Sequence, residues 1–119
     1  MTAHPYETKL NRLLDRMGGL YTVQDILTLV HDGKMQSFAE GDTFAVTQIA
    51  RFPRATVLEI LMVVGELKGC QKLLDRIFQF ANVNDIGLVQ AYGRRGWLDH
   101  PLTYGWKIKT KSYLYQRSL

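Results

Sequence analysis

The sequence predicts a mixed α/β (α+β) domain in which helices flank a mostly antiparallel sheet. Residues 1–33 carry apolar side chains at helical spacing, and from Lys34 the spacing changes to that of strands. One further amphipathic helix follows three strands, so both kinds of element contribute to one architecture. With 119 residues, 46% of them hydrophobic, the chain can build one core, and we expect a single domain over residues 1–119.

Two helices are expected at the start of the chain. The first runs from Pro5 to Met17, with apolar residues three, four and seven positions apart, and Gly18-Gly19 ends it. The second begins at Thr22, which forms with Asp25 the pattern of a capping box. Gly33 ends this second helix, because glycine readily adopts the positive φ of a helix C-terminus.

Three strands are expected next, at residues 35–40, 43–52 and 56–64. The third contains VLEILMVV, which has apolar side chains on both faces, so we expect a central strand covered on both sides. Helical spacing returns at Cys70, Leu73, Leu74, Ile77 and Ala81. A strand at Ile86 to Tyr92, the turn GRRGW and a strand or strand pair at Tyr104 to Gln116 complete the expected order.

Glu59 is the one charged residue of the apolar strand, and a buried carboxylate is costly unless it has a partner or faces a cleft. Two interpretations are open. Glu59 pairs with an arginine, Arg51 or Arg54, near the start of the strand. Alternatively, it is a general base in a cleft.

The order of elements and two segments resemble the GNAT acyltransferase family. VLEILMVVGELKGCQKLLDRI occupies the place where, in that family, a central strand splays from its neighbour and the next loop and helix N-terminus cradle the pyrophosphate of acetyl-CoA. The later GLVQAYGRRGWLDH and YGWK resemble the family's closing strand, short helix and turn. The resemblance implies a GNAT-like fold from Thr22 onward, with Glu59 as catalytic base and Lys68 and Gly69 in cofactor binding.

The cradle differs from the family pattern Arg/Gln-x-x-Gly-x-Gly/Ala at two residues. Glu66 places a negative charge where a cation or an amide belongs, and Gln71 replaces a small residue. Family members also begin with a strand, whose place is taken here by the helix from Pro5 to Met17. We therefore expect no cofactor, with acetyl-CoA disfavoured, and a domain that has lost catalytic activity.

A narrower resemblance concerns GNAT-like proteins encoded in the morphogenesis gene clusters of tailed bacteriophages and prophages, which have this layout and end in a GRxGW turn and a short strand. It implies a non-catalytic virion-associated or assembly protein in the virion or host cytoplasm, acting through contacts with other virion or assembly proteins. An acyl-CoA-dependent N-acyltransferase is the alternative. A nucleic-acid-binding module is the second alternative.

The C-terminal segment is the expected interaction surface. Residues 94–119 contain six Lys and Arg residues and one acid, Asp99. Lysines and tyrosines occupy every second position of the expected strand and therefore share one face. This pattern suits a solvated outer face or a protected sheet edge. The same pattern suits contact with phosphates and stacked bases, or with a partner protein. This surface comprises Arg94, Arg95, Trp97, Lys107, Lys109, Lys111, Tyr113 and Tyr115.

The remaining chemistry-bearing residues point to few kinds of site. The three histidines lie far apart and, with a single cysteine, give no metal-ligand spacing, so no metal site is expected. Cys70 is either a reactive thiol at a helix N-terminus or a small buried residue of the apolar stripe. No apolar run reaches the roughly 18 residues that a membrane-spanning helix requires, so no membrane span is expected.

Overall fold

A computed structural model describes residues 7–16, 18–65, 67–91 and 116–118, and of residues 67–69 it describes the backbone alone. Two helices begin this part of the chain, three strands follow, and a helix and a short strand complete it. Their bounds are α1 (Glu7–Arg16), α2 (Val23–His31), β1 (Gln36–Glu40), β2 (Thr43–Phe52), β3 (Ala55–Val64), α3 (Leu67–Val83) and β4 (Leu88–Ala91).

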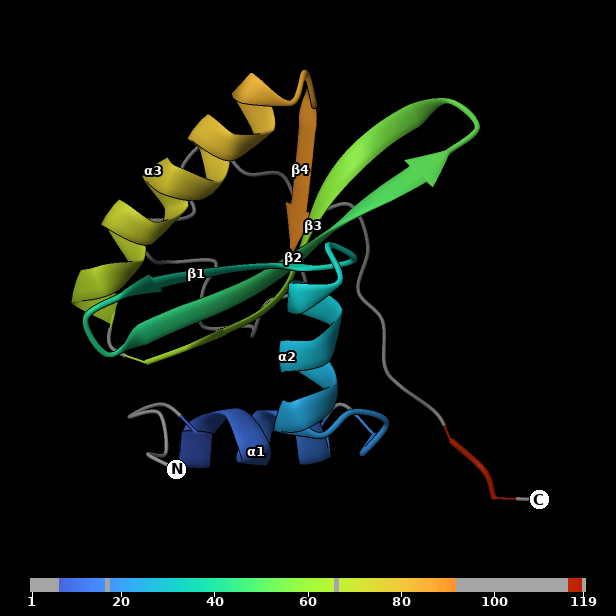
Figure 1. The fold of residues 1–119 in the computed structure, drawn as a ribbon, viewed down its shortest axis with the longest axis vertical. Helices are drawn as coiled ribbons and strands as arrows, with labels where there is room; N and C mark the ends of the chain where they lie inside the picture. Colours follow the sequence, from blue (N-terminus) through green and yellow to red (C-terminus); the bar gives the residue numbers. More distant parts are fainter. Residues whose placement is uncertain (1–6, 17, 66, 92–115, 119) are drawn as a thin grey trace.

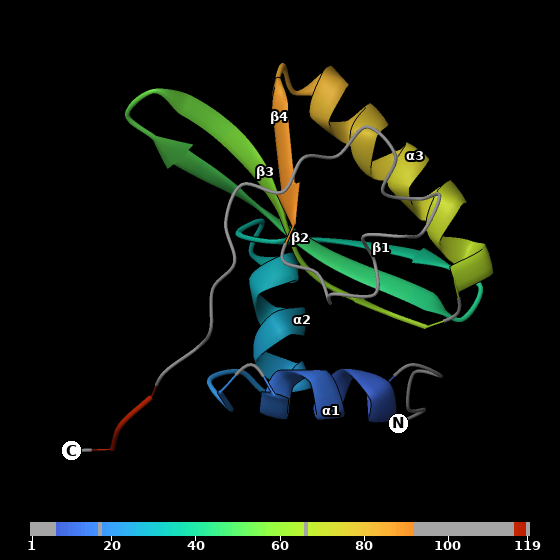
Figure 2. The same ribbon diagram turned by 180° about the vertical axis from the view of Figure 1, so that it is seen from behind.

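The four strands form one sheet in the order β1-β2-β3-β4. The first three strands pair antiparallel, and β4 pairs parallel with β3 after the crossover through α3. Helix α3 covers one face of the sheet, and α1 and α2 lie on the other face (Figures 1 and 2). The expectation of a mixed, mostly antiparallel sheet flanked by helices is confirmed.

Each face of the sheet has its own hydrophobic core. Under α1 and α2, the buried residues are Leu10, Leu14, Ile26, Met35, Phe44, Val46, Met62 and Val64. Under α3, they are Phe38, Ala45, Leu58, Ile60, Leu73, Ile77, Ala81 and Ile86. Strand β3 contributes to both cores, which is why its sequence is apolar on both faces and why the prediction of a doubly covered strand is confirmed.

All three helices of the described chain end in the same way, with a residue of positive φ and a pair of backbone hydrogen bonds that close the last turn. Gly18 and Gly33, which the sequence identified as helix stops, have φ values of 101° and 74°. At the end of α3 the residue is Asp85, with φ 57°, and Ile86 donates to the carbonyl of Ala81. Because Ile86 belongs to this turn, β4 begins two residues later than expected, at Leu88.

A β-bulge interrupts the pairing of β2 with β3. Val46 pairs with Met62 and Thr47 pairs with Ile60, so Leu61 is an extra residue on β3. The last pair between β3 and β4 is Ile60 with Ala91, directly before the bulge. A bulge bends its strand and increases the local twist, so β3 changes direction where its described pairing with β4 stops.

The other sequence predictions divide into confirmed elements and elements outside the described residues. The capping box at Thr22 is present, since its hydroxyl accepts from the Asp25 N–H and the Asp25 carboxylate accepts from the Thr22 N–H. The three expected strands and the helix around Cys70 are present. The GRRGW turn, and the strand expected from Tyr104 except for its end at Gln116, lie outside the described residues.

Candidate functional site

The candidate site lies around the last described pair of β3 with β4 and the connection from β3 to α3. Residues Val57 to Ile60 pair with Leu88 to Ala91, which is the last described residue of β4, and β3 continues to Val64. Gly65 and residue 66 then connect β3 to the N-terminus of α3 at Leu67. Within the described residues, this leaves the edge of β3 after the bulge without a paired strand, next to the helix N-terminus.

Glu59 lies on β3 two residues before the bulge and is buried, with 8% of its surface exposed. Its neighbours Leu58 and Ile60 belong to the core under α3, so alternation along the strand places Glu59 on the opposite face. Its Oε2 accepts a hydrogen bond of 3.0 Å from Nε2 of Gln90 on β4. The buried carboxylate therefore has an amide partner, which reduces the cost of its burial.

The ion pair expected between Glu59 and Arg51 or Arg54 is absent from the described residues. Gln48 is the Cα partner of Glu59 on β2, so Arg51, three residues further along, lies on the other face of the sheet. Arg54 lies in the exposed turn between β2 and β3. Glu59 instead occupies the middle of a polar row across three strands, Gln48, Glu59 and Gln90.

The predicted cofactor-binding residues, Lys68 and Gly69, are in the first turn of α3. Glu66 and the side chain of Lys68 lie outside the described residues. Gln71 is described, and its Nε2 donates a hydrogen bond of 3.0 Å to Oδ1 of Asp75, one turn toward the C-terminus of the helix. The bulky amide is therefore directed along α3 and away from its N-terminus, which removes one of the two objections to a phosphate at this place.

Cys70 is a buried residue, with 9% of its surface exposed. Burial raises the pKa of the Cys70 thiol above its usual 9.0, because a thiolate is poorly solvated there. Of the two interpretations left open by the sequence, the structure favours the small buried residue over the reactive thiol.

We expect Cys70 to react with a soluble disulfide reagent at neutral pH about 100-fold more slowly in the folded protein than in urea, since burial disfavours both access and the thiolate. Because its pKa is raised, the Cys70 thiol keeps its proton in the folded protein at a pH where it loses the proton in the unfolded chain. Stability should therefore fall as the pH rises above 9.0, toward the folded pKa. The Cys70→Ala variant should lack this part of the pH dependence in urea titrations, and an unchanged dependence would contradict the assignment.

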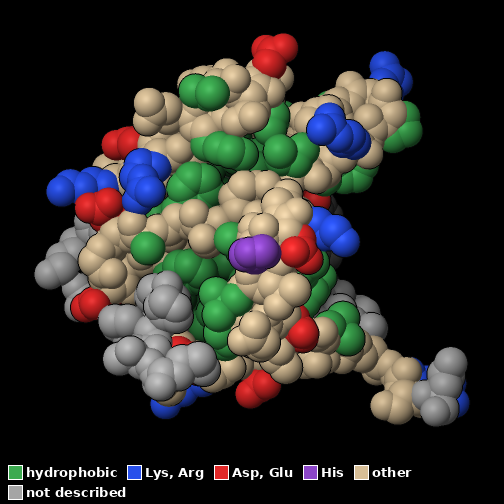
Figure 3. Space-filling model, in the orientation of Figure 1, with side chains coloured by type: hydrophobic (Ala, Val, Ile, Leu, Met, Phe, Trp, Pro, Cys, Tyr) green, Lys and Arg blue, Asp and Glu red, His purple; other side chains and the backbone are tan. Residues whose placement is uncertain are grey.

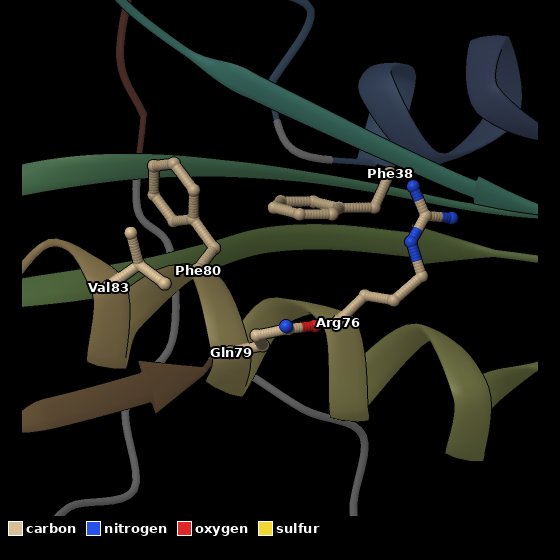
Figure 4. Close-up of a pocket in the computed structure, with 5 residues that line it drawn as sticks. All are labelled: Phe38, Arg76, Gln79, Phe80 and Val83. Atoms are coloured by element: carbon tan, nitrogen blue, oxygen red, sulfur yellow. The ribbon is translucent and has the colours of Figure 1, made fainter.

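A shallow hollow of about 270 Å³ lies between α3 and the edge strand β1, lined by Phe38, Arg76, Gln79, Phe80 and Val83 (Figure 4). Arg76 crosses toward β1, where its Nη1 donates to the carbonyl of Ala39 at 2.6 Å and lies 3.6 Å from Oε2 of Glu40. Its guanidinium also lies 5.9 Å from the centroid of the Phe38 ring. These contacts give Arg76 a structural role in closing part of the sheet edge.

The charged side chains of the described residues do not gather into a recognisable site. In the view of Figure 3, hydrophobic side chains lie over the middle of the molecule and Lys and Arg side chains mostly at its periphery. Among the described residues, no group of three or more His, Cys, Asp and Glu could hold a metal ion. Within the same residues, no helix is long and apolar enough to cross a membrane.

The predicted C-terminal interaction surface lies outside the described residues. Its partner, whether a protein or a nucleic acid, therefore stays a prediction. The residues concerned are Arg94, Arg95, Trp97, Lys107, Lys109, Lys111, Tyr113 and Tyr115.

Comparison with solved structures identifies the fold. The chain is similar to the protein TTHA1254 of Thermus thermophilus, studied as a point mutant, with 21% identity, a TM-score of 0.63, and coverage of 99% of this chain and 94% of the other. It is similar to a probable acetyltransferase with 10% identity, a TM-score of 0.67, and coverage of 97% and 90%. No protein-family model and no curated protein matches the sequence.

A third similar structure is an aminoglycoside acetyltransferase from an uncultured soil metagenomic sample, in complex with sisomicin, with 10% identity, a TM-score of 0.63, and coverage of 98% and 93%. The acetyltransferases among the similar structures have the GNAT fold, and the chain therefore has a GNAT-like fold.

The comparisons contradict the expectation of a non-catalytic virion or assembly protein. The similar structures whose names state an activity are acetyltransferases, and none of them indicates a bacteriophage, a virion or a loss of activity. The function predicted from the sequence was wrong because the sequence gives the charge of Glu66 and the size of Gln71, but not the direction in which a side chain points. In the fold, Gln71 is directed away from the start of α3.

Proposed function

We propose that this chain is an acyl-CoA-dependent N-acyltransferase. The observation that carries the proposal is the combination, in a GNAT-like fold, of a parallel strand pair beside a bulge in β3, a helix N-terminus that follows β3 after Gly65 and residue 66, and a buried carboxylate two residues before the bulge. Each part has a chemical use in acyl transfer from a CoA thioester to an amine.

The backbone at the start of α3 fits the pyrophosphate of an acyl-CoA. The first N–H groups of a helix have no partner within the helix, and the helix dipole favours an anion there. The first turn of α3 contains no acidic residue, and it includes Lys68 and Gly69. Within the described residues, β3 has no partner beyond Ile60 on the side of β4, so its backbone groups from Leu61 to Val64 are candidates to hydrogen-bond the amides of an extended CoA arm.

Glu59 is the proposed general base. An acyl-CoA supplies a thioester whose carbonyl carbon is open to attack by an amine. As the new C–N bond forms and the C–S bond breaks, the amine must lose a proton, and the Glu59 carboxylate would accept it at a site that excludes most water. The role needs one carboxylate oxygen that is open to the substrate. Oε2 accepts from Gln90, whereas Oε1 accepts no hydrogen bond within the described residues and is the oxygen that we propose faces the amine.

The proposed acceptor is a primary amine. The structural relative in complex with sisomicin acts, by its name, on aminoglycosides, which are polyamines. From this relative we take over only the chemical class of the acceptor, an amine, because an identity of 10% says nothing about substrate preference. A suitable first panel contains an aminoglycoside, a small alkyl amine and a peptide with a free N-terminus.

Calorimetry with acetyl-CoA tests the donor site. We expect binding in the micromolar range, and we expect the Gly69→Arg variant to lose at least tenfold in affinity, because a long side chain in the first turn of α3 should hinder close approach of the pyrophosphate to the backbone. Gly87→Arg is the matched control, since a Cβ at Gly87 meets no atom within 4 Å, and its affinity should stay within twofold of the wild type. Absence of acetyl-CoA binding by the wild type would overturn the proposed function.

A further inference from the structure

The only described hydrogen bond between side chains of β3 and β4 joins the candidate base to its neighbour on the parallel strand. Gln90 is the Cα partner of Glu59, and its Nε2 donates to Oε2 at 3.0 Å. The pair lies one position before the last pairing of the two strands, Ile60 with Ala91. Gln90 therefore ties the Glu59 carboxylate to the parallel strand β4.

The two oxygens of Glu59 consequently differ in environment. Oε2 accepts a hydrogen bond from the Gln90 amide, whereas Oε1 accepts none within the described residues. A carboxylate held through one oxygen has fewer rotamers open to it, so its other oxygen is presented in a defined direction. A general base benefits from such fixed placement, because proton transfer requires hydrogen-bond distance and alignment.

We propose that Gln90 is a positioning residue for acyl transfer, which holds Oε2 of Glu59 so that Oε1 faces the amine. The inference rests on the proposed function and deepens it, since it assigns a role to a residue that does not itself exchange a proton. Gln48 provides an internal comparison. It carries the same amide and is the Cα partner of Glu59 on the other side, on β2, but within the described residues it makes no hydrogen bond to the carboxylate.

The test compares Gln90→Met with Gln48→Met, two substitutions that remove an amide while nearly preserving side-chain length and flexibility. With acetyl-CoA and a saturating amine, we expect Gln90→Met to lower kcat about tenfold with the KM for acetyl-CoA unchanged. Gln48→Met should keep kcat within twofold of the wild type. Equal losses in both variants, or a wild-type kcat in Gln90→Met, would overturn the positioning role.

A second measurement examines the hydrogen bond without turnover. Hydrogen exchange of the side-chain amides, followed by NMR on the wild-type protein, should be about tenfold slower for Gln90 than for Gln48, and Glu59→Leu should remove the difference. Equal exchange in the wild type would overturn the inference even if Gln90→Met failed to fold. A wild type that neither binds acetyl-CoA nor transfers acetyl groups overturns the proposed function, and the positioning role falls with it. If the wild type is active and Gln90→Met keeps the wild-type kcat, the positioning role is overturned and the proposed function stands.

Discussion

Replacing Glu59 by glutamine should lower kcat for amine acetylation by about 100-fold or more, while acetyl-CoA binding stays within twofold of the wild type. The amide of the Glu59→Gln variant is nearly the same size as the carboxylate, and its carbonyl oxygen can still accept from Gln90. It cannot accept the proton that the amine loses. The predicted loss therefore concerns the chemical step and not the fold or the donor site.

The measurement is a thiol-release assay at saturating acetyl-CoA, combined with calorimetry on the same preparations. Glu40→Gln is the matched control, because it removes a half-buried carboxylate from β1 that contacts Arg76 and lies outside the candidate site. We expect it to retain at least half of the wild-type kcat. If Glu59→Gln keeps more than a third of the wild-type kcat, the carboxylate is not the general base and the amine reaches the thioester without it.

The sequence predicted the fold well where local residues determine the structure. Gly18 and Gly33 end helices because each adopts a positive φ, and Thr22 with Asp25 begins a helix through two reciprocal hydrogen bonds. The end of α3 was harder to predict, since Asp85 takes the conformation that glycine takes in the other two helices. That difference displaced the predicted start of β4 by two residues.

The candidate site was only partly predictable because its key relationships join residues far apart in the chain. Glu59 was identified as an exception in an apolar strand, but its partner Gln90 lies 31 residues later. Their contact depends on the register of a parallel pair, which no local pattern specifies. The bulge at Leu61 was hidden for a similar reason, since a strand that is apolar on both faces keeps the same pattern when one residue is inserted.

The connection between β3 and α3 depends on close approach of two backbone segments at Gly65. Its φ is 119°, which side-chain-bearing residues rarely adopt. A Cβ placed there would lie 2.6 Å from the Cα of Thr43 and would also overlap the carbonyl oxygen of Asp42. These are backbone atoms of the turn between β1 and β2 and of the start of β2, so no side chain can rotate away to relieve the contact.

We therefore expect Gly65→Ala to lower the free energy of unfolding by about 3 kcal/mol, combining roughly 1–2 kcal/mol of backbone strain with a similar cost of overpacking. Gly41→Ala is the matched control. Its φ of 58° is also positive, but a Cβ meets no atom within 4 Å, so strain alone should cost about 1 kcal/mol. Urea titrations of the three proteins measure the difference. If both variants lose the same free energy of unfolding, backbone strain alone explains the glycine at position 65. The close approach of the β1–β2 turn would then play no part.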